Sequence, residues 1–342
     1  MGNTSSRVKP LRSCFSAPAP ASVSASASAP ASWARIRSPR AVPRFPYATT
    51  PESSTSQFSE KNTDHVQARK PDLEETPSIR RFLDFDLHDR VYIVTGGGRG
   101  LGLCMAEALL EAGANVHCLD RLPTPHPDFE AAKSHAAEQT NGGSLHYHRL
   151  DVRDPAETNE LFAKIASEHS RLDGLIAAAG INYLAPALSH TPEKLHEVMD
   201  INFNGVFHSA TAAAHQMINY QQKGSILLVA SMSGFIANKG MTSPVYNSSK
   251  AAVVQLARNL AMEWGKHGIR VNSLCPGHIV TPMVDQVFQR EPGARAIWEA
   301  ENMLGRLATP EEFRGSALFM LSDASSFMTG SMLVLDGGHT AW

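Results

Sequence analysis

From residue 85 to the end of the chain, short apolar runs typical of strands alternate with segments that have helical spacing. The strand-like runs are 91–95, 115–120, 145–150, 174–178, 225–230, 270–274 and 332–335. The helix-like segments between them are 102–111, 129–139, 157–169, 192–220, 245–267 and 310–321. Short, continuous apolar strands separated by helices indicate a parallel sheet that is covered on both faces. Because crossover connections are right-handed, the chain is predicted to be a doubly wound α/β protein that binds its ligands at the carboxyl ends of the strands.

Charge and composition divide the chain before this region. Residues 1–51 carry seven basic side chains and no acidic ones, a formal charge of +7, whereas the remaining 291 residues carry −9. This segment is dominated by Ser, Ala and Pro and is predicted to be disordered. Residues 52–84 resemble a polar linker, and residues 85–342 are then predicted to form a single folded domain of about 258 residues.

The acid-free, Arg- and Ser-rich composition of residues 1–51 is typical of a mitochondrial presequence. Two other interpretations stay open, an inert extension on a cytoplasmic protein and a myristoylation signal at residues 1–6.

The composition of the whole chain also excludes several classes of protein. No apolar run reaches the roughly 18 to 20 residues of a membrane span, and a net charge of −2 gives no reason to expect nucleic acid. Cys14, Cys104, Cys118 and Cys275 lie too far apart for a disulfide scaffold or a zinc site, so no metal is expected.

A glycine-rich turn connects the first strand to the first helix. Its residues are Thr95, Gly96, Gly97, Gly98, Arg99, Gly100, Leu101 and Gly102. Glycines at such spacing allow a tight turn and a close backbone approach to a pyrophosphate at the helix N-terminus, which predicts a dinucleotide site of Rossmann type. Asp120 ends the next strand, where a carboxylate can accept hydrogen bonds from the adenosine ribose and would repel a 2′-phosphate. We therefore expect NAD, although Arg99 and Arg121 are residues that can clasp the 2′-phosphate of NADP.

The pair Tyr246 and Lys250 carries the predicted chemistry. The two side chains are four residues apart on one face of a predicted helix, and Ser231 precedes Tyr246 by 15 residues, just after a strand. A free phenol has a pKa near 10, and a neighbouring ammonium lowers it, so Tyr246 is a candidate general base. Ser231 can donate a hydrogen bond to the substrate oxygen. Taken singly, these residues could also be an amphipathic surface pair and a helix cap.

These motifs, in this order, resemble those of the short-chain dehydrogenase/reductase family. The matching features are the Thr-Gly-x-x-x-Gly-x-Gly turn, Asn202, Ser231, the Tyr-x-x-x-Lys pair, the segment 276–281 and the closing Asp336-Gly337-Gly338. The resemblance covers residues 85–342 and implies a Rossmann-type fold, NAD(P) as cofactor and a homotetramer. It departs from the family at Ala177-Ala178-Ala179-Gly180, where many members have Asn-Asn-Ala-Gly.

The resemblance also implies roles for individual residues. Asn202 would hold a water that links Lys250 to solvent, and Lys250 would reach the nicotinamide ribose. The remaining expected cofactor contacts are Asp151, Val152, Gly180, Pro276, Gly277, Ile279 and Thr281. Asp151 would contact the adenine ring, and the residues from Pro276 onward would border the nicotinamide.

Within the family, residues 224–234, 261–264 and 336–342 are most similar to fungal polyol and ketose members. This similarity predicts hydride transfer between D-arabinitol and D-ribulose with NAD, with Ser231, Ser233, Asn238 and His278 as candidate substrate contacts. The alternatives are an NADP(H)-dependent ketose reductase and a ketoreductase of fungal secondary or fatty-acyl metabolism. The latter would use an apolar lid within residues 277–305. A non-catalytic dinucleotide sensor is a more distant alternative.

Overall fold

The computed structural model describes residues 80–138, 142–281, 284, 288–289 and 293–342. The predicted N-terminal extension and all of the predicted linker up to residue 79 lie outside the described residues. The presequence interpretation therefore stays a prediction. Within the described part of the chain, no helix combines the length and the apolar character that crossing a membrane requires.

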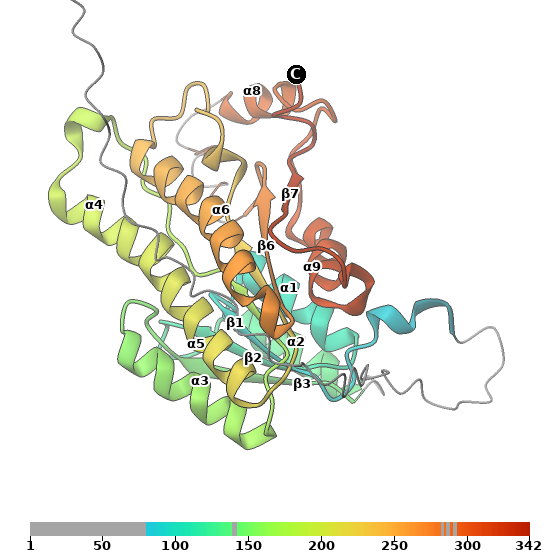
Figure 1. Cartoon of the computed structure of the whole chain (residues 1–342). Helices are drawn as coiled ribbons and strands as arrows, with labels where there is room; N and C mark the ends of the chain where they lie inside the picture. The colour runs from blue at the N-terminus through green and yellow to red at the C-terminus, as the bar shows by residue number, and fades with distance from the viewer. Residues whose placement is uncertain (1–79, 139–141, 282–283, 285–287, 290–292) are drawn as a thin grey trace, which may run out of the picture. The chain divides into compact units, whose positions relative to one another are not determined.

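Seven parallel strands form one sheet (Figure 1). They are β1 (Val91–Thr95), β2 (Asn115–Asp120), β3 (Ser144–Arg149), β4 (Gly174–Ala177), β5 (Gly224–Val229), β6 (Ile269–Pro276) and β7 (Met332–Leu335). The spatial order is β3-β2-β1-β4-β5-β6-β7, so the order reverses between β1 and β4. The prediction of a doubly wound parallel sheet is confirmed, and the reversal places the ligand crevice at the carboxyl ends of β1 and β4.

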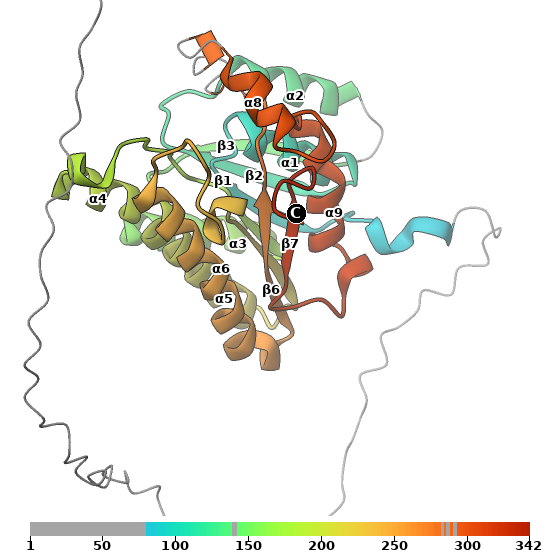
Figure 2. The same ribbon diagram turned by 90° about the horizontal axis from the view of Figure 1, so that it is seen from above.

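Helices cover both faces of the sheet (Figure 2). Their bounds are α1 (Gly100–Glu111), α2 (Pro127–Glu138), α3 (Pro155–His169), α4 (Pro192–Met199), α5 (Gly205–Asn219), α6 (Pro244–Trp264), α8 (Ala294–Ala300) and α9 (Arg314–Leu321). Helices α1, α2 and α9 share one buried apolar cluster with the sheet, and α3, α5 and α6 share the other. The central strands are apolar without alternation because both of their faces are buried.

One predicted helix is not continuous. The spacing predicts a single helix over residues 192–220, but a π-helical turn, Asp200–Asn204, separates α4 from α5. Within this turn, Asn202 is fully buried, and its side chain bonds the backbone of Ile181. One extra residue in a turn scarcely changes the apolar spacing of the flanking helices, which explains why the prediction was wrong, and such turns often lie at functional sites.

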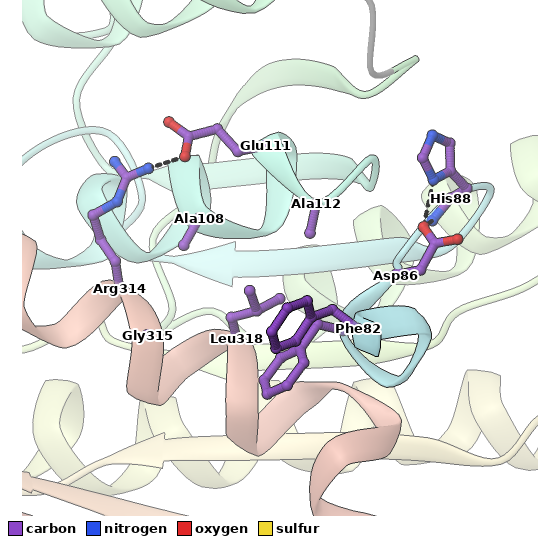
Figure 3. Close-up of a pocket in the computed structure, with 10 residues that line it drawn as sticks. Phe82, Asp86, His88, Ala108, Glu111, Ala112, Arg314, Gly315 and Leu318 are labelled. Atoms are coloured by element: carbon purple, nitrogen blue, oxygen red, sulfur yellow. Dashed lines mark hydrogen bonds and ion pairs between the residues drawn. The ribbon is translucent and has the colours of Figure 1, made fainter. Parts of the chain in front are cut away.

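The described residues include part of the predicted linker 52–84. Residues Arg80–Phe85 form a short 3-10 segment before β1. Figure 3 shows Phe82 lying against Leu318 of α9, in a pocket that is also bordered by Ala112 after α1. Apolar contact with α1 and α9 thus attaches residues that composition alone assigns to a polar linker.

Candidate active site

The glycine-rich turn lies at the point where the strand order reverses. Gly96 has φ +70°, and a Cβ atom there would lie 2.8 Å from the backbone nitrogen of Ala179, which follows β4. A Cβ on Gly102 would lie 2.2 Å from the carbonyl oxygen of Gly96. Glycine is therefore required at both positions for close packing. Gly100 has φ +58° and open space where a side chain would stand.

Helix α1 begins in this turn without a side-chain cap, since Arg99 at the N-cap position accepts no hydrogen bond from the first turn. Its first N–H groups are therefore available to an anion, and they carry the positive end of the helix dipole. The open space at Gly100 and these donors fit the pyrophosphate of a dinucleotide.

Asp120 faces the same turn. A Cβ atom on Gly98 would lie 2.9 Å from Cβ of Asp120 and 3.0 Å from its Oδ2. The other carboxylate oxygen accepts a hydrogen bond from the backbone N–H of Leu122 at 3.3 Å. Arg99 and Arg121 are both exposed. The carboxylate is thus held directly against the turn that would receive the cofactor.

Two further predicted cofactor contacts, Asp151 and Val152, follow β3. Hydrogen bonds from Arg153 hold the pKa of Asp151 below its ordinary value. Val152 is buried, and a Cβ on Gly205 would lie 2.5 Å from it, so Val152 also fixes the start of α5. An adenine contact at Asp151 would share the carboxylate with Arg153.

Ser231 and Tyr246 lie together at the carboxyl end of β5. Ser231 is buried and accepts a hydrogen bond from the backbone N–H of Ser233 at 3.2 Å, so it caps the short 3-10 turn Met232–Gly234. Burial raises the pKa of Tyr246, and a hydrogen bond with the Ser231 side chain opposes this rise. Ser231 therefore both caps the 3-10 turn and forms a hydrogen bond with the phenol of Tyr246.

Lys250 is one helical turn after Tyr246 on α6, with its Nζ 5.8 Å from the centre of the phenol ring. The ammonium donates a hydrogen bond to the carbonyl of Val229 at 2.9 Å, and burial lowers its pKa to about 8. The hydrogen bond that opposes the rise in the pKa of Tyr246 comes from Ser231. That Lys250 also lowers this pKa stays a prediction.

Asn202 connects the loop after β4 to α6. Its Oδ1 accepts from the N–H of Ile181 at 2.8 Å, and its Nδ2 donates to the carbonyl of Ile181 and to Oγ of Ser249. A Cβ atom on Gly180 would lie 3.4 Å from Asn202 Oδ1 and 3.5 Å from Lys250 Nζ. The structure thus brings Gly180, Asn202 and Lys250 together. The side-chain amide of Asn202 is bonded to protein atoms, and the predicted water link between Lys250 and solvent stays a prediction.

The segment after β6 lies against the closing turn of the chain. A Cβ on Gly277 would lie 2.6 Å from Cα of Asp336, which explains the glycine. Ile279 pairs with Ala308 in an isolated bridge, and Oγ1 of Thr281 accepts from the N–H of Val284 at 3.4 Å. The predicted nicotinamide border, Pro276 to Thr281, is therefore held in place by both the closing turn and the segment before α9.

The candidate substrate residues separate into two groups. Ser233 and Asn238 are buried together, with Asn238 Nδ2 donating to Ser233 Oγ at 2.6 Å. Oδ1 of Asn238 is buried and has no hydrogen-bond partner among the described residues. His278 instead stacks on Trp298 with ring centres 4.4 Å apart, and burial lowers its pKa to about 4.

The sequence analysis did not find the carbonyl of Val229, which accepts the hydrogen bond from Lys250. A backbone group carries no sequence signal, so it could not be predicted.

Comparisons with known proteins identify the family of the chain. The family model described as enoyl-(acyl carrier protein) reductase matches residues 96–340. The short-chain dehydrogenase/reductase notP′ of Aspergillus versicolor is 43% identical over 272 residues, covering 78% of this chain and 92% of the relative. Galactitol 2-dehydrogenase of Rhizobium johnstonii is 39% identical, covering 75% of this chain and 98% of the relative. D-arabinitol 2-dehydrogenase of Scheffersomyces stipitis is 35% identical, covering 76% of this chain and 96% of the relative.

Among solved structures, gluconate 5-dehydrogenase of Burkholderia cenocepacia, in complex with NADP and tartrate, is similar with a TM-score of 0.68 and 30% identity. The match covers 76% of this chain and 98% of that one. The family model spans most of the chain, and the relatives match over nearly their whole length. The chain therefore belongs to the short-chain dehydrogenase/reductase family, whose members are NAD(P)-dependent oxidoreductases acting on alcohol groups.

Proposed function

We propose that the protein oxidises a secondary hydroxyl of a polyol to the ketone, with D-arabinitol and D-ribulose as the substrate pair and NAD as the cofactor. One observation supports a polyhydroxylated substrate above all. The buried amide of Asn238, which donates to Ser233 two residues after Ser231, has an acceptor oxygen without a described partner. A buried acceptor left unpaired costs free energy, so a substrate hydroxyl that donates to it gains affinity.

Each site residue has a role in this proposal. Tyr246 takes the hydroxyl proton, and Ser231 donates a hydrogen bond to the same oxygen as negative charge develops on it. Lys250 keeps a positive charge beside the phenol, where it favours the phenolate once its ammonium turns away from the Val229 carbonyl. Bound NAD supplies the acceptor for the hydride that leaves the substrate carbon.

The preference for NAD rests on Asp120. Its carboxylate is fixed against Gly98, where the 2′ position of an adenosine ribose would lie. A 2′-phosphate placed there would face a negative charge at short range, which is costly unless a cation intervenes. Arg99 directly follows Gly98, Arg121 directly follows Asp120, and both are exposed. They are therefore the residues that would reverse this preference for NAD if they closed over a phosphate.

A second candidate function is reduction of a more apolar ketone. Phe288 and Trp298 pack edge to face with ring centres 5.2 Å apart, and Ile297 beside them is 60% exposed. Such an apolar surface near the predicted nicotinamide border would suit a ketoreductase of secondary or fatty-acyl metabolism. Val287, which the sequence also assigned to this lid, lies outside the described residues.

The test is a substrate panel. Purified full-length protein is assayed with D-arabinitol, galactitol, other polyols and apolar alcohols, each with NAD and NADP. We expect activity on polyols with NAD, and a fall in kcat/KM of about tenfold in Asn238→Ala, since one hydrogen bond is worth about 1.5 kcal/mol. Lys239→Ala, at the exposed neighbouring position, is the matched control. Activity on apolar alcohols alone, or no effect of Asn238→Ala on polyols, would overturn the polyol proposal.

The homotetramer implied by the family stays a proposal as well, and light scattering of the purified protein tests it. The mitochondrial address is tested separately by imaging the full chain fused at its C-terminus to a fluorescent protein. Loss of mitochondrial signal when residues 1–51 are removed is the expected result.

A further inference from the structure

Three side chains from distant segments meet beside the loop after β6. They are His278, two residues past β6, Glu301, directly after α8, and His339, in the closing turn after β7. One ligand atom from each lies within 4.8 Å of the other two. The residues are 23 and 38 positions apart in sequence, which is why spacing gave no sign of the cluster.

The imidazole of His339 is oriented by a buried amide. Its Nδ1 lies 3.1 Å from Oδ1 of Asn302, and Nδ2 of Asn302 donates to the carbonyl of Arg306 at 2.7 Å. A carbonyl can only accept, so this second bond fixes which way the amide points. Asn302 therefore accepts from His339, the proton of His339 is on Nδ1, and Nε2 keeps a free lone pair. Metal-binding histidines are usually oriented in this way.

The other two side chains are also placed for a ligand. The ring of His278 stacks on Trp298 and meets the His339 ring edge to face, with centres 5.2 Å apart, so both rings are held by packing. Glu301 is half-buried, and its carboxylate makes no hydrogen bond or ion pair with any residue that the structure describes. A half-buried carboxylate without a cation between two imidazoles is the pattern that a bound cation would complete.

We propose that His278, Glu301 and His339 bind a divalent transition-metal ion, with Zn²⁺ the best match. Two imidazoles and one carboxylate are a donor set that suits zinc, whereas Ca²⁺ and Mg²⁺ favour oxygen ligands. Zinc bonds of about 2.1 Å place tetrahedral ligands about 3.4 Å apart, so the cluster must contract by at most about 1.4 Å. The fourth ligand is water.

The ion would join three segments that are distant in sequence, the loop after β6, the end of α8 and the closing turn. The closing turn is already bonded to the segment after α8, since Leu304 N–H donates to the carbonyl of Gly337 at 3.1 Å. Adding bonds from His278 ties both segments to the loop that borders the predicted nicotinamide position. The ion acts here as a structural cross-link, and the proton transfer proposed for Tyr246 does not require it.

The experiment uses full-length protein treated with EDTA, desalted and titrated with ZnCl₂ in a calorimeter. The metal content after a second desalting is measured by atomic spectrometry. We expect one Zn²⁺ per chain and a higher Tm with zinc. Glu301→Gln, which keeps the size of the side chain, and His339→Asn should each weaken binding by about 100-fold or more, since even the loss of an orienting partner costs about 10–100-fold.

Two controls each remove one imidazole elsewhere. His267→Asn changes an exposed histidine just before β6, at the opposite end of the strand from His278. His146→Asn changes the other histidine-rich place in the described chain, between β2, β3 and α3. Both should retain zinc with unchanged affinity. The proposal is overturned if the unmodified protein retains no zinc, if Glu301→Gln and His339→Asn bind it as well as the unmodified protein, or if His146→Asn abolishes binding. In those cases His278 only stacks on Trp298, and His339 only packs against His278.

Discussion

A buried histidine on β2 should make the stability of the protein fall at mildly acidic pH. His117 is 2% exposed, and its two ring nitrogens lie 2.9 Å from Nε2 of His148 and 3.0 Å from Nε2 of His169. His146 stacks on the same ring at 4.7 Å. A neutral His117 donates one hydrogen bond and accepts the other, whereas a protonated His117 would have to donate both and would place its charge among three further imidazoles.

Burial, followed by these neighbouring histidines, lowers the pKa of His117 from 6.5 to about 3. Burial also lowers the pKa values of His146 and His148, with smaller contributions from Lys133 and Lys164 that Glu168 opposes. Between pH 7.5 and 5.5 the unfolded chain takes up a proton at this position and the folded chain does not. The contribution of His117 to the free energy of unfolding is therefore fully present above pH 6.5, and it is lost as the pH falls toward 3. The loss between pH 7.5 and 5.5 is about 1.4 kcal/mol.

Urea unfolding at the two pH values measures this loss. His117→Gln keeps one donor and one acceptor but does not titrate, so the difference in unfolding free energy between pH 7.5 and 5.5 should shrink by about 1.4 kcal/mol. His135→Gln, at an exposed position on α2, should leave the difference unchanged. If His117→Gln loses as much stability on acidification as the unmodified protein, then His117 is not the group that resists protonation.

Three substitutions in the candidate site have direct expectations. Tyr246→Phe should lower kcat by about 10²–10⁴-fold while binding of NAD, followed by fluorescence, persists. Asp120→Ser should raise the ratio of kcat/KM with NADP to that with NAD by about tenfold or more, because one carboxylate is removed from the 2′ position; an unchanged ratio would mean that Asp120 does not read the ribose. Asn202→Ala should lower the free energy of unfolding by about 2–3 kcal/mol, since it leaves the backbone groups of Ile181 unpaired; denaturation with guanidinium measures it.

The parallel sheet could be predicted from the sequence because each strand and most helices have an apolar pattern of their own. It was not sufficient for the break at Asp200–Asn204, where a π-helical turn adds one residue without changing the character of either helix. It also missed the ordered segment Arg80–Phe85, whose folding depends on contact with α1 and α9 and not on its own composition.

The same distinction holds for the site. Candidate residues with side chains at a fixed spacing, such as Tyr246 and Lys250, could be proposed from the sequence. Their partners could not, because the carbonyl that holds Lys250 belongs to Val229 and any residue type would supply it. His278 was assigned to the substrate, yet its neighbours in space are Trp298 and His339, which only the tertiary fold brings together.

Asn202 holds the loop after β4, next to the place where the chain departs from the family. Ala177 and Ala178 stand where many members have two asparagines, so neither side chain can form a hydrogen bond across the loop. Asn202 binds both backbone groups of Ile181 and the hydroxyl of Ser249, which joins the loop after β4 to α6 one residue before Lys250. Because three bonds converge on one buried amide, the position of Lys250 depends on the π-helical turn that presents Asn202. Loss of Asn202 should therefore disturb the site through Lys250 as well as through stability.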